Sequence, residues 1–202
     1  YNYISTGQHN KGIDELNYSF SLKKPDVVLY SGKDIVSPFS MLIWSVSILC
    51  KSMFLRKRIF KDDRAGVVLV HGDTITTLIG AMMGRMAGLK VAHIEAGLRS
   101  SDFFHPFPEE ITRVLTSYIS DYFFCPGQWA IDNLKKRSGI KVNTFDNTLF
   151  DTLQSAIEMM EKIDVNIPEY KYCIVSIHRY ENLLNKKRLS RIVEIAEYIA
   201  LS

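Results

Sequence analysis

Acidic and basic side chains gather directly after the apolar runs that are typical of strands in a parallel sheet. In such a sheet the ligand crevice lies beyond the carboxyl ends of the strands, so side chains at these positions converge on one edge. The residues concerned are Asp73 after GVVLV, Glu95 after KVAHI, Glu109 and Glu110 after the loop 99–108, and His178 after CIVSI. We therefore expect one carboxylate-rich site at this edge.

Several acids beside one histidine suit proton transfer at a weakly acidic C–H bond. Burial and mutual repulsion separate the pKa values of two neighbouring carboxyl groups, so that one holds a proton while the other accepts one. Such a reaction needs a general base and a general acid on either side of the same carbon. Arg99, Arg113 and Arg179 lie near the same edge, and guanidinium groups are suited to clamping a diphosphate.

Each of these residues also has a structural interpretation. Asp73 is placed to cap the helix that follows it. Glu109 and Glu110 begin a helix, where negative charge suits the helix dipole. His178 fits a hydrogen-bonded core histidine. Glu95 is harder to explain in this way, because a charge at the end of an apolar run must find a partner.

The sequence implies no metal and no cofactor. His71, His93 and His105 have no spacing among themselves or with the acids that forms a recognisable metal set, so we interpret them as structural. A Gly-x-Gly-x-x-Gly motif is absent from the sequence, and a nicotinamide cofactor is therefore unsupported.

Short β-rich runs alternate with helical patterns along the whole chain. The predicted strands are 2–6, 26–30, 66–70, 90–94, 122–125, 141–145 and 172–177. The predicted helices are 74–87, 108–119, 128–136, 149–163 and 185–200. This alternation predicts an α/β fold, with a Rossmann-like parallel sheet covered by helices on both faces.

A polar, proline-containing stretch, KIDVNIPEYK, indicates a linker. We predict a first domain over residues 1–165 and the start of a second over residues 166–202. One strand and one helix bury too little apolar surface to fold alone. We therefore expect both ends of the chain to be cut, with the rest of the second domain missing.

Composition and charge argue against a nucleic-acid-binding protein, a disulfide-bonded protein and a membrane-inserted protein. The 202 residues include 25 Lys and Arg against 22 Asp and Glu, a net charge of +3 that is too small to indicate a nucleic-acid partner. Three separated cysteines, Cys50, Cys125 and Cys173, indicate reduced thiols and a cytoplasmic location. The apolar stretch 36–55 is interrupted by serines, Pro38 and Lys51, so we expect a buried crossover helix and no membrane insertion.

The motifs together resemble one family. They are VLVHGDTITT (68–77), HIEAGLRS (93–100), PFPEEITR (106–113), DNTLFDTL (146–153) and SIHRYEN (176–182). Their order and spacing are similar to those of the non-hydrolysing UDP-N-acetylglucosamine 2-epimerases over nearly the whole chain. The resemblance implies a two-domain, glycosyltransferase-B-like arrangement with the active site in the cleft between the domains.

The resemblance also implies the reaction. Members of the family interconvert UDP-N-acetylglucosamine and UDP-N-acetylmannosamine, or a related UDP-amino-sugar pair. They eliminate UDP to form a 2-acetamidoglucal and add it back with C2 inverted. Such an enzyme would serve surface polysaccharide synthesis, and the resemblance implies a homodimer, for which the helix within 37–55 is the candidate contact.

By position in these motifs, the residues that correspond to the essential acid–base groups of the family are Asp73, Glu95, Glu109 and His178. Those that correspond to its substrate-binding residues are Gln8, His9, Arg113, Arg179 and Glu181. The chain also departs from the family. The Gly-Thr-Arg-Pro-Glu strand and loop is absent, and Asp146, Lys11 and Tyr180 replace residues that are common there. The Lys11 change argues against activation of the enzyme by its own substrate. The Tyr180 change means that the resemblance does not identify which UDP-amino-sugar is the substrate.

Three other functions stay open from the sequence. A hydrolysing 2-epimerase would release N-acetylmannosamine and UDP. A glycosyltransferase of the same two-domain shape would need an acceptor and would exchange no proton at C2. A non-catalytic nucleotide-sugar binding module would depend on none of the acids. The HIEAGLR run resembles the non-hydrolysing branch more closely.

Overall fold

The structure is a computed structural model that describes residues 1–202 except 9, 36, 62, 161–168, 170–171, 177–184 and 202. The chain divides into two units, Tyr1–Thr152 and Leu153–Ser202. The predicted domain boundary at residue 165 lies outside the described residues.

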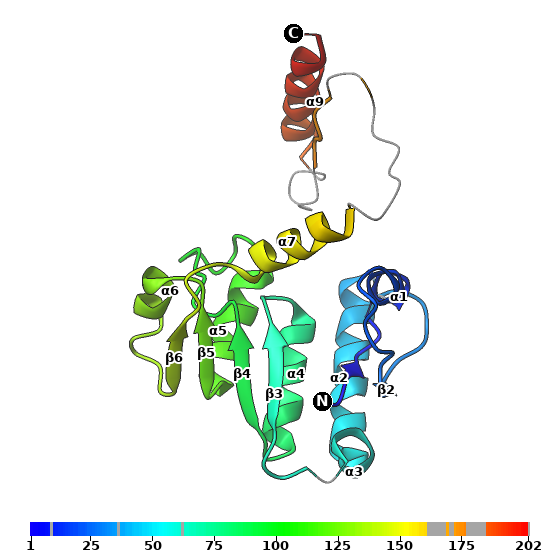
Figure 1. Ribbon diagram of the computed structural model, residues 1–202, viewed down its shortest axis with the longest axis vertical. Helices are drawn as coiled ribbons and strands as arrows, with labels where there is room; N and C mark the ends of the chain where they lie inside the picture. The colour runs from blue at the N-terminus through cyan, green and yellow to red at the C-terminus, as the bar shows by residue number, and fades with distance from the viewer. Residues whose placement is uncertain are drawn as a thin grey trace. The chain divides into compact units, whose positions relative to one another are not determined.

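The first unit contains two parallel sheets (Figure 1). In the smaller sheet, β1 (Ile4–Ser5) pairs with β2 (Val27–Val28). The larger sheet has the order β3-β4-β5-β6, formed by β3 (Val67–His71), β4 (Lys90–Ile94), β5 (Tyr122–Cys125) and β6 (Ile140–Asn143). All three pairings of this sheet are parallel, so the carboxyl ends of its strands share one edge. We call it the carboxyl edge.

Helices alternate with the strands along the chain, and two of them, over 10–19 and 56–60, have no counterpart among the predicted helices. The helices that begin in the first unit are α1 (Asn10–Ser19), α2 (Pro38–Phe54), α3 (Arg56–Phe60), α4 (Ile75–Met86), α5 (Glu109–Ile119), α6 (Gln128–Asn133) and α7 (Thr148–Met160). Val70 and Val91 of the sheet pack against Ala81 of α4, and Phe123 and Cys125 pack against α6. The predicted α/β class with a Rossmann-like parallel sheet is confirmed.

A shared core joins the two sheets. Trp44 and Ile48 of α2 are buried against Ile79 and Met83 of α4, in the same cluster as Leu29 after β2. Figure 1 shows α2 and α4 side by side. Because α4 begins directly after β3, this packing fixes the loop at the carboxyl end of β3.

One face of α2 is buried and the opposite face is exposed. Trp44, Ile48 and Ser52 lie on the buried face, four residues apart. The expectation of a buried helix is thus correct for this face only, because apolar side chains line the other face as well. None of the helices in the described part of the chain has the length and hydropathy of a membrane-spanning segment.

The largest corrections to the predicted secondary structure concern three strands. β1 and β2 are only two residues long each. Residues 172–176, in the second unit, form no strand although a strand was predicted over 172–177. A parallel strand exists only where a neighbour accepts its hydrogen bonds, and Ile174 is 85% exposed. In the second unit α9 (Lys186–Leu201) forms close to its predicted range.

Candidate active site

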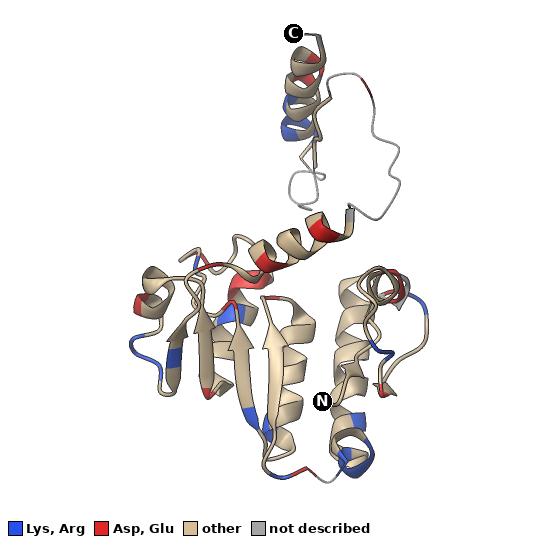
Figure 2. Cartoon of the chain, in the orientation of Figure 1, with Lys and Arg blue, Asp and Glu red and all other residues tan. Residues whose placement is uncertain are grey.

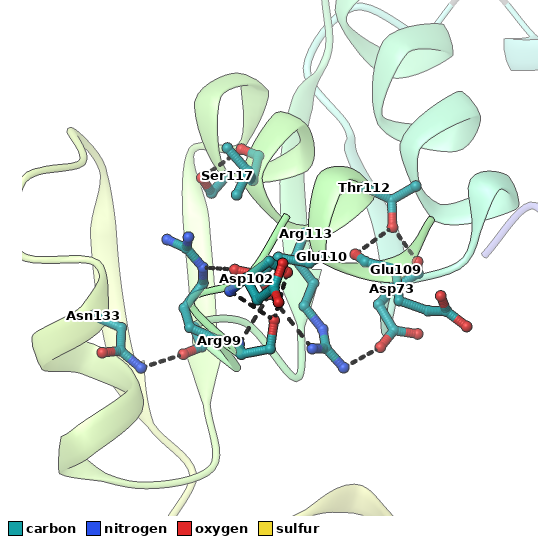
Figure 3. Close-up of polar contacts among 12 residues, drawn as sticks. Asp73, Arg99, Asp102, Glu109, Glu110, Thr112, Arg113, Ser117 and Asn133 are labelled. Atoms are coloured by element: carbon teal, nitrogen blue, oxygen red, sulfur yellow. Dashed lines mark hydrogen bonds and ion pairs between the residues drawn. The ribbon is translucent and has the colours of Figure 1, made fainter. Parts of the chain in front are cut away.

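Asp73 does not cap the helix that follows it, because Thr74 does. The Thr74 hydroxyl accepts a hydrogen bond from the Thr77 backbone N–H, which is the role of an N-cap residue. The carboxylate of Asp73 is therefore available for another partner. It accepts a hydrogen bond from Arg113 Nη2 of α5 (Figure 3).

The first turn of α5 is joined to the Asp73 loop by Thr112. Its hydroxyl is buried and lies within hydrogen-bond distance of two backbone carbonyl oxygens, that of Asp73 and that of Glu109 (2.8 Å). One hydroxyl proton thus links the backbones of two of the predicted acids (Figure 3). Glu109 Oε2 is buried and has no hydrogen-bond partner among the described residues. The structure therefore brings Asp73, Glu109 and Arg113 together, as the sequence predicts.

Glu95 lies at the end of β4, beside the same loop. Its φ is +61°, a left-handed conformation that costs a residue with a side chain about 1 kcal/mol. Its carboxylate is 16% exposed and lies 3.9 Å from His71 Nε2. A methyl group built on Gly72 would lie 4.0 Å from Glu95 Oε2. The Glu95 carboxylate is therefore next to the residue that precedes Asp73.

His71, which the sequence leads us to interpret as structural, also lies at this edge. Its Nε2 lies 2.8 Å from Thr148 Oγ1 and 3.9 Å from Glu95 Oε2. The signal in the sequence was its place at the end of a strand, immediately before the Gly72–Asp73 pair.

His93, which the sequence leads us to interpret as structural, is buried beneath the Gly72–Asp73 loop. Its Nε2 donates to the Gly72 carbonyl oxygen at 2.7 Å. Burial lowers the pKa of His93, and the hydrogen bond to Gly72 only partly offsets that effect. A neutral imidazole thus supports the loop.

Glu110 makes more contacts than a charge in the first turn of a helix requires. Its side chain is fully buried, and it accepts hydrogen bonds from Arg99 Nε at 2.5 Å and from the Ser100 backbone N–H at 3.0 Å. Arg113 Nη1 lies 3.7 Å from Glu110 Oε2. The spacing of three residues between Glu110 and Arg113 on one helix is the available signal for this contact.

Gln8 is held near the same edge. Its side-chain oxygen accepts a hydrogen bond from Thr76 of the first turn of α4, and its Nε2 lies 3.6 Å from Met41 Sδ. Gly7 has a φ of +75°, and a Cβ there would lie 1.8 Å from the Tyr30 carbonyl oxygen. A glycine is required before Gln8 for the chain to pass this close.

Four of the predicted site residues lie outside the described residues: His9, His178, Arg179 and Glu181. In the described part of the chain, no group of three or more His, Cys, Asp or Glu side chains is arranged to hold a metal ion. Figure 2 shows acidic positions at the carboxyl ends of the strands and at the start of α5. The arrangement provides three carboxylates and a guanidinium, which are groups for proton transfer beside an anion.

Comparison with known proteins agrees with this chemistry. The family model described as UDP-N-acetylglucosamine 2-epimerase matches residues 1–202. A UDP-N-acetylglucosamine 2-epimerase homolog of Methanococcus maripaludis is 35% identical over 202 residues, which cover 94% of this chain and 53% of the relative. A UDP-2,3-diacetamido-2,3-dideoxy-D-glucuronate 2-epimerase of Pseudomonas aeruginosa is 38% identical over 210 residues, covering 98% of this chain and 55% of the relative.

A solved structure is also similar. The UDP-GlcNAc 2-epimerase of Methanocaldococcus jannaschii, in complex with UDP-GlcNAc and UDP, has a TM-score of 0.76 at 31% identity and covers 98% of this chain and 54% of its own. The chain spans about half the length of the curated relatives that it matches. The match over its whole length shows that this chain belongs to the UDP-N-acetylglucosamine 2-epimerase family.

Proposed function

We propose that the full-length protein interconverts UDP-N-acetylglucosamine and UDP-N-acetylmannosamine without hydrolysis. The observation that carries this proposal is the meeting of Asp73, Glu95 and Glu109 at one edge, beside Arg113, in a chain of this family. A related structure whose title names bound UDP-GlcNAc and UDP supports the substrate class.

The reaction that suits these groups is an elimination followed by an addition. A carboxylate takes the proton from C2 of the sugar, the C1–O bond to UDP breaks, and a C1–C2 double bond forms. A UDP oxygen then attacks C1 while a proton returns to the opposite face of C2. Asp73, Glu95, Glu109 and His178 share the acid and base roles in this proposal.

Substrate binding is assigned to the remaining predicted residues. Arg113 faces the negative charge that develops on the departing diphosphate. The other residues proposed to contact the substrate are Gln8, His9, Arg179 and Glu181. The protein then acts in the cytoplasm as a homodimer and serves surface polysaccharide synthesis.

Product analysis in deuterated water tests the reaction. The full-length protein with UDP-N-acetylglucosamine should place deuterium at C2 of a product that still carries UDP. Free N-acetylmannosamine with an equal amount of UDP would indicate the hydrolysing reaction instead. A transferred sugar without deuterium would indicate a glycosyltransferase.

A second UDP-amino-sugar is a specific alternative substrate. The Pseudomonas aeruginosa relative is named for a UDP-diacetamido-dideoxy-glucuronate and is 38% identical to this chain. Comparing kcat/KM for both UDP-sugars with the same enzyme decides between them, and we expect the higher value for UDP-N-acetylglucosamine.

The exposed face of α2 supports the proposed homodimer. Its apolar side chains lie at helical spacing on the side opposite Trp44, and they are Phe39, Leu42, Ile43, Val46, Met53 and Phe54. Between Pro38 and Cys50 the helix carries no charge, whereas Arg56, Lys57 and Arg58 follow its end. Two copies packed antiparallel would bury the stripe and keep these basic residues apart.

Light scattering of the full-length protein tests this contact. We expect a dimer for the natural protein and a monomer for Ile43→Glu, because a charge would be buried in an apolar interface. Tyr18→Glu on α1, where the ring is also exposed, is the matched control and should remain a dimer. A dimeric Ile43→Glu variant would contradict the proposal.

A further inference from the structure

Glu110 is a buried carboxylate that the proposed reaction does not use. Its side chain reaches back from α5 to the loop that follows β4, where it meets Arg99 and the Ser100 N–H. Burial raises the pKa of Glu110, but the hydrogen bonds from Ser100 and Arg99 outweigh that effect, so the pKa is below its ordinary value. Glu110 is therefore a fixed negative charge under the site.

Arg113 lies between this charge and Asp73. One terminal nitrogen, Nη1, lies 3.7 Å from Glu110 Oε2, and the other, Nη2, donates to Asp73 Oδ2 (Figure 3). Its Nε is buried and has no hydrogen-bond partner among the described residues. The orientation of the guanidinium is thus set by two carboxylates, of which only Asp73 is partly exposed, at 28%.

We infer that Glu110 is a positioning residue, which aims the Arg113 guanidinium at Asp73 and the substrate diphosphate. The identity of the substrate in this inference rests on the proposed function. The role of Glu110 rests on the contacts of Arg113. Without the charge of Glu110, Arg113 keeps its attraction to Asp73 but loses the contact that fixes its direction. Small displacements of such groups cost large factors in rate, about 100-fold for roughly 1 Å.

Two substitutions separate positioning by charge from packing. Glu110→Gln keeps the size of the side chain and removes the charge, whereas Glu110→Asp keeps the charge and shortens the side chain. If Glu110 acts through its charge on Arg113, kcat/KM of the full-length enzyme should fall about 100-fold in the Gln variant and only about 10-fold in the Asp variant. A packing role predicts the reverse order, and that order would overturn the inference.

A spectroscopic measurement is independent of turnover. In ¹⁵N-arginine-labelled full-length protein, a guanidinium held on two sides rotates slowly and shows separate Nη signals. Arg113→Lys identifies its signals by their loss. We expect them separate in the natural protein and in Glu110→Asp, and merged in Glu110→Gln.

Asp121→Asn is the matched control for both measurements. Asp121 also holds two cations and a backbone N–H, but at the opposite edge of the sheet. This variant should keep the activity and the Arg113 signals. If the natural protein fails to convert UDP-sugars, the proposed function is wrong. The guanidinium signals still show in that case whether Glu110 fixes the orientation of Arg113. Separate Arg113 signals in a folded Glu110→Gln variant would overturn the inference.

Discussion

Glu110 and Asp121 have the same kinds of partner at opposite edges of the larger sheet. Glu110 accepts from Arg99 and from the Ser100 N–H, with Arg113 nearby. Asp121 accepts from Lys90 (3.1 Å) and from the Val91 N–H (2.9 Å), with Arg85 Nη1 at 3.2 Å. The pKa of each carboxyl lies below its ordinary value, because these partners outweigh the effect of burial.

The two networks differ in what surrounds them. At the amino ends of the strands, which we call the amino edge, the backbone of Asp121 also joins Val91 and Ile140 of the neighbouring strands. The network therefore ties the starts of β4, β5 and β6 together. At the carboxyl edge, Glu109 Oε2 and Arg113 Nε lack partners among the described residues, and Glu95 has a positive φ. Unmatched polar groups and backbone strain in one place are typical of a functional site. Asp121 and its partners, by contrast, satisfy one another's hydrogen bonds and join neighbouring strands.

The largest expected effect is a difference in activity between variants at the two edges of the sheet. Asp73→Asn in the full-length enzyme should lower kcat about 1,000-fold, because an amide cannot take or return a proton and acid–base groups contribute roughly 10²–10⁴-fold. Asp121→Asn should leave kcat unchanged. Steady-state conversion of UDP-N-acetylglucosamine measures both, and equal losses would refute the division between the edges.

A second prediction separates the networks by stability and its pH dependence. Glu110→Gln should lower the free energy of unfolding by about 3 kcal/mol at neutral pH, because the partly buried guanidinium groups of Arg99 and Arg113 lose their charge partner. Asp121→Asn should cost about 1 kcal/mol or less, since Arg85 and Lys90 are largely exposed.

The sign of the pH dependence follows from the lowered pKa of Glu110. Its contribution is complete above the ordinary value of 4.5 and is lost as the pH falls through the lower pKa of the folded state. Urea unfolding of the natural protein and of Glu110→Gln should therefore converge in acid. A gap that widens below pH 4.5 would contradict this.

Two glycines, one near each edge of the sheet, test the same difference through the backbone. Gly97 (φ +85°) and Gly139 (φ +111°) would place a Cβ 2.2 Å from the Ala130 carbonyl oxygen and 2.5 Å from that of Asp121. Alanine at either position should cost about 2 kcal/mol of stability. Only Gly97→Ala should also lower kcat, calculated per folded molecule, because Gly97 lies two residues after Glu95 in the same loop. Thermal melts of both variants measure the loss of stability, and kinetics corrected for the folded fraction measure kcat.

The smallest effect concerns two threonines one turn apart on α5. Thr112→Val removes the hydroxyl that links Asp73 to Glu109 and should cost about 1 kcal/mol together with a loss of kcat. The Thr116 hydroxyl is buried without a hydrogen-bond partner in the described part of the chain. Thr116→Val should therefore be neutral or stabilising in urea unfolding, and a loss equal to that of Thr112→Val would argue against the link.

Much of the larger sheet could be predicted from the sequence. β4 and β5 have the predicted bounds, because a short apolar run between turn signals is typical of a buried parallel strand. α1 and α3 were not predicted. The sequence of α1, NKGIDELNYS, carries no continuous apolar stripe, and α3 has only five residues. Strand pairing shortened β1 and β2, since their lengths depend on their neighbours.

Which acids share one edge follows from their positions in the sequence. Asp73, Glu95 and Glu109 each follow a strand, or the loop after one, and parallel strands bring these positions to one edge whatever the details of packing. The partners of these acids depend instead on how the helices pack. Glu109 and Glu110 are neighbours in sequence but about 100° apart around α5. That rotation turns Glu110 into the protein toward Arg99, a distinction that depends on how α5 packs against the loop after β4.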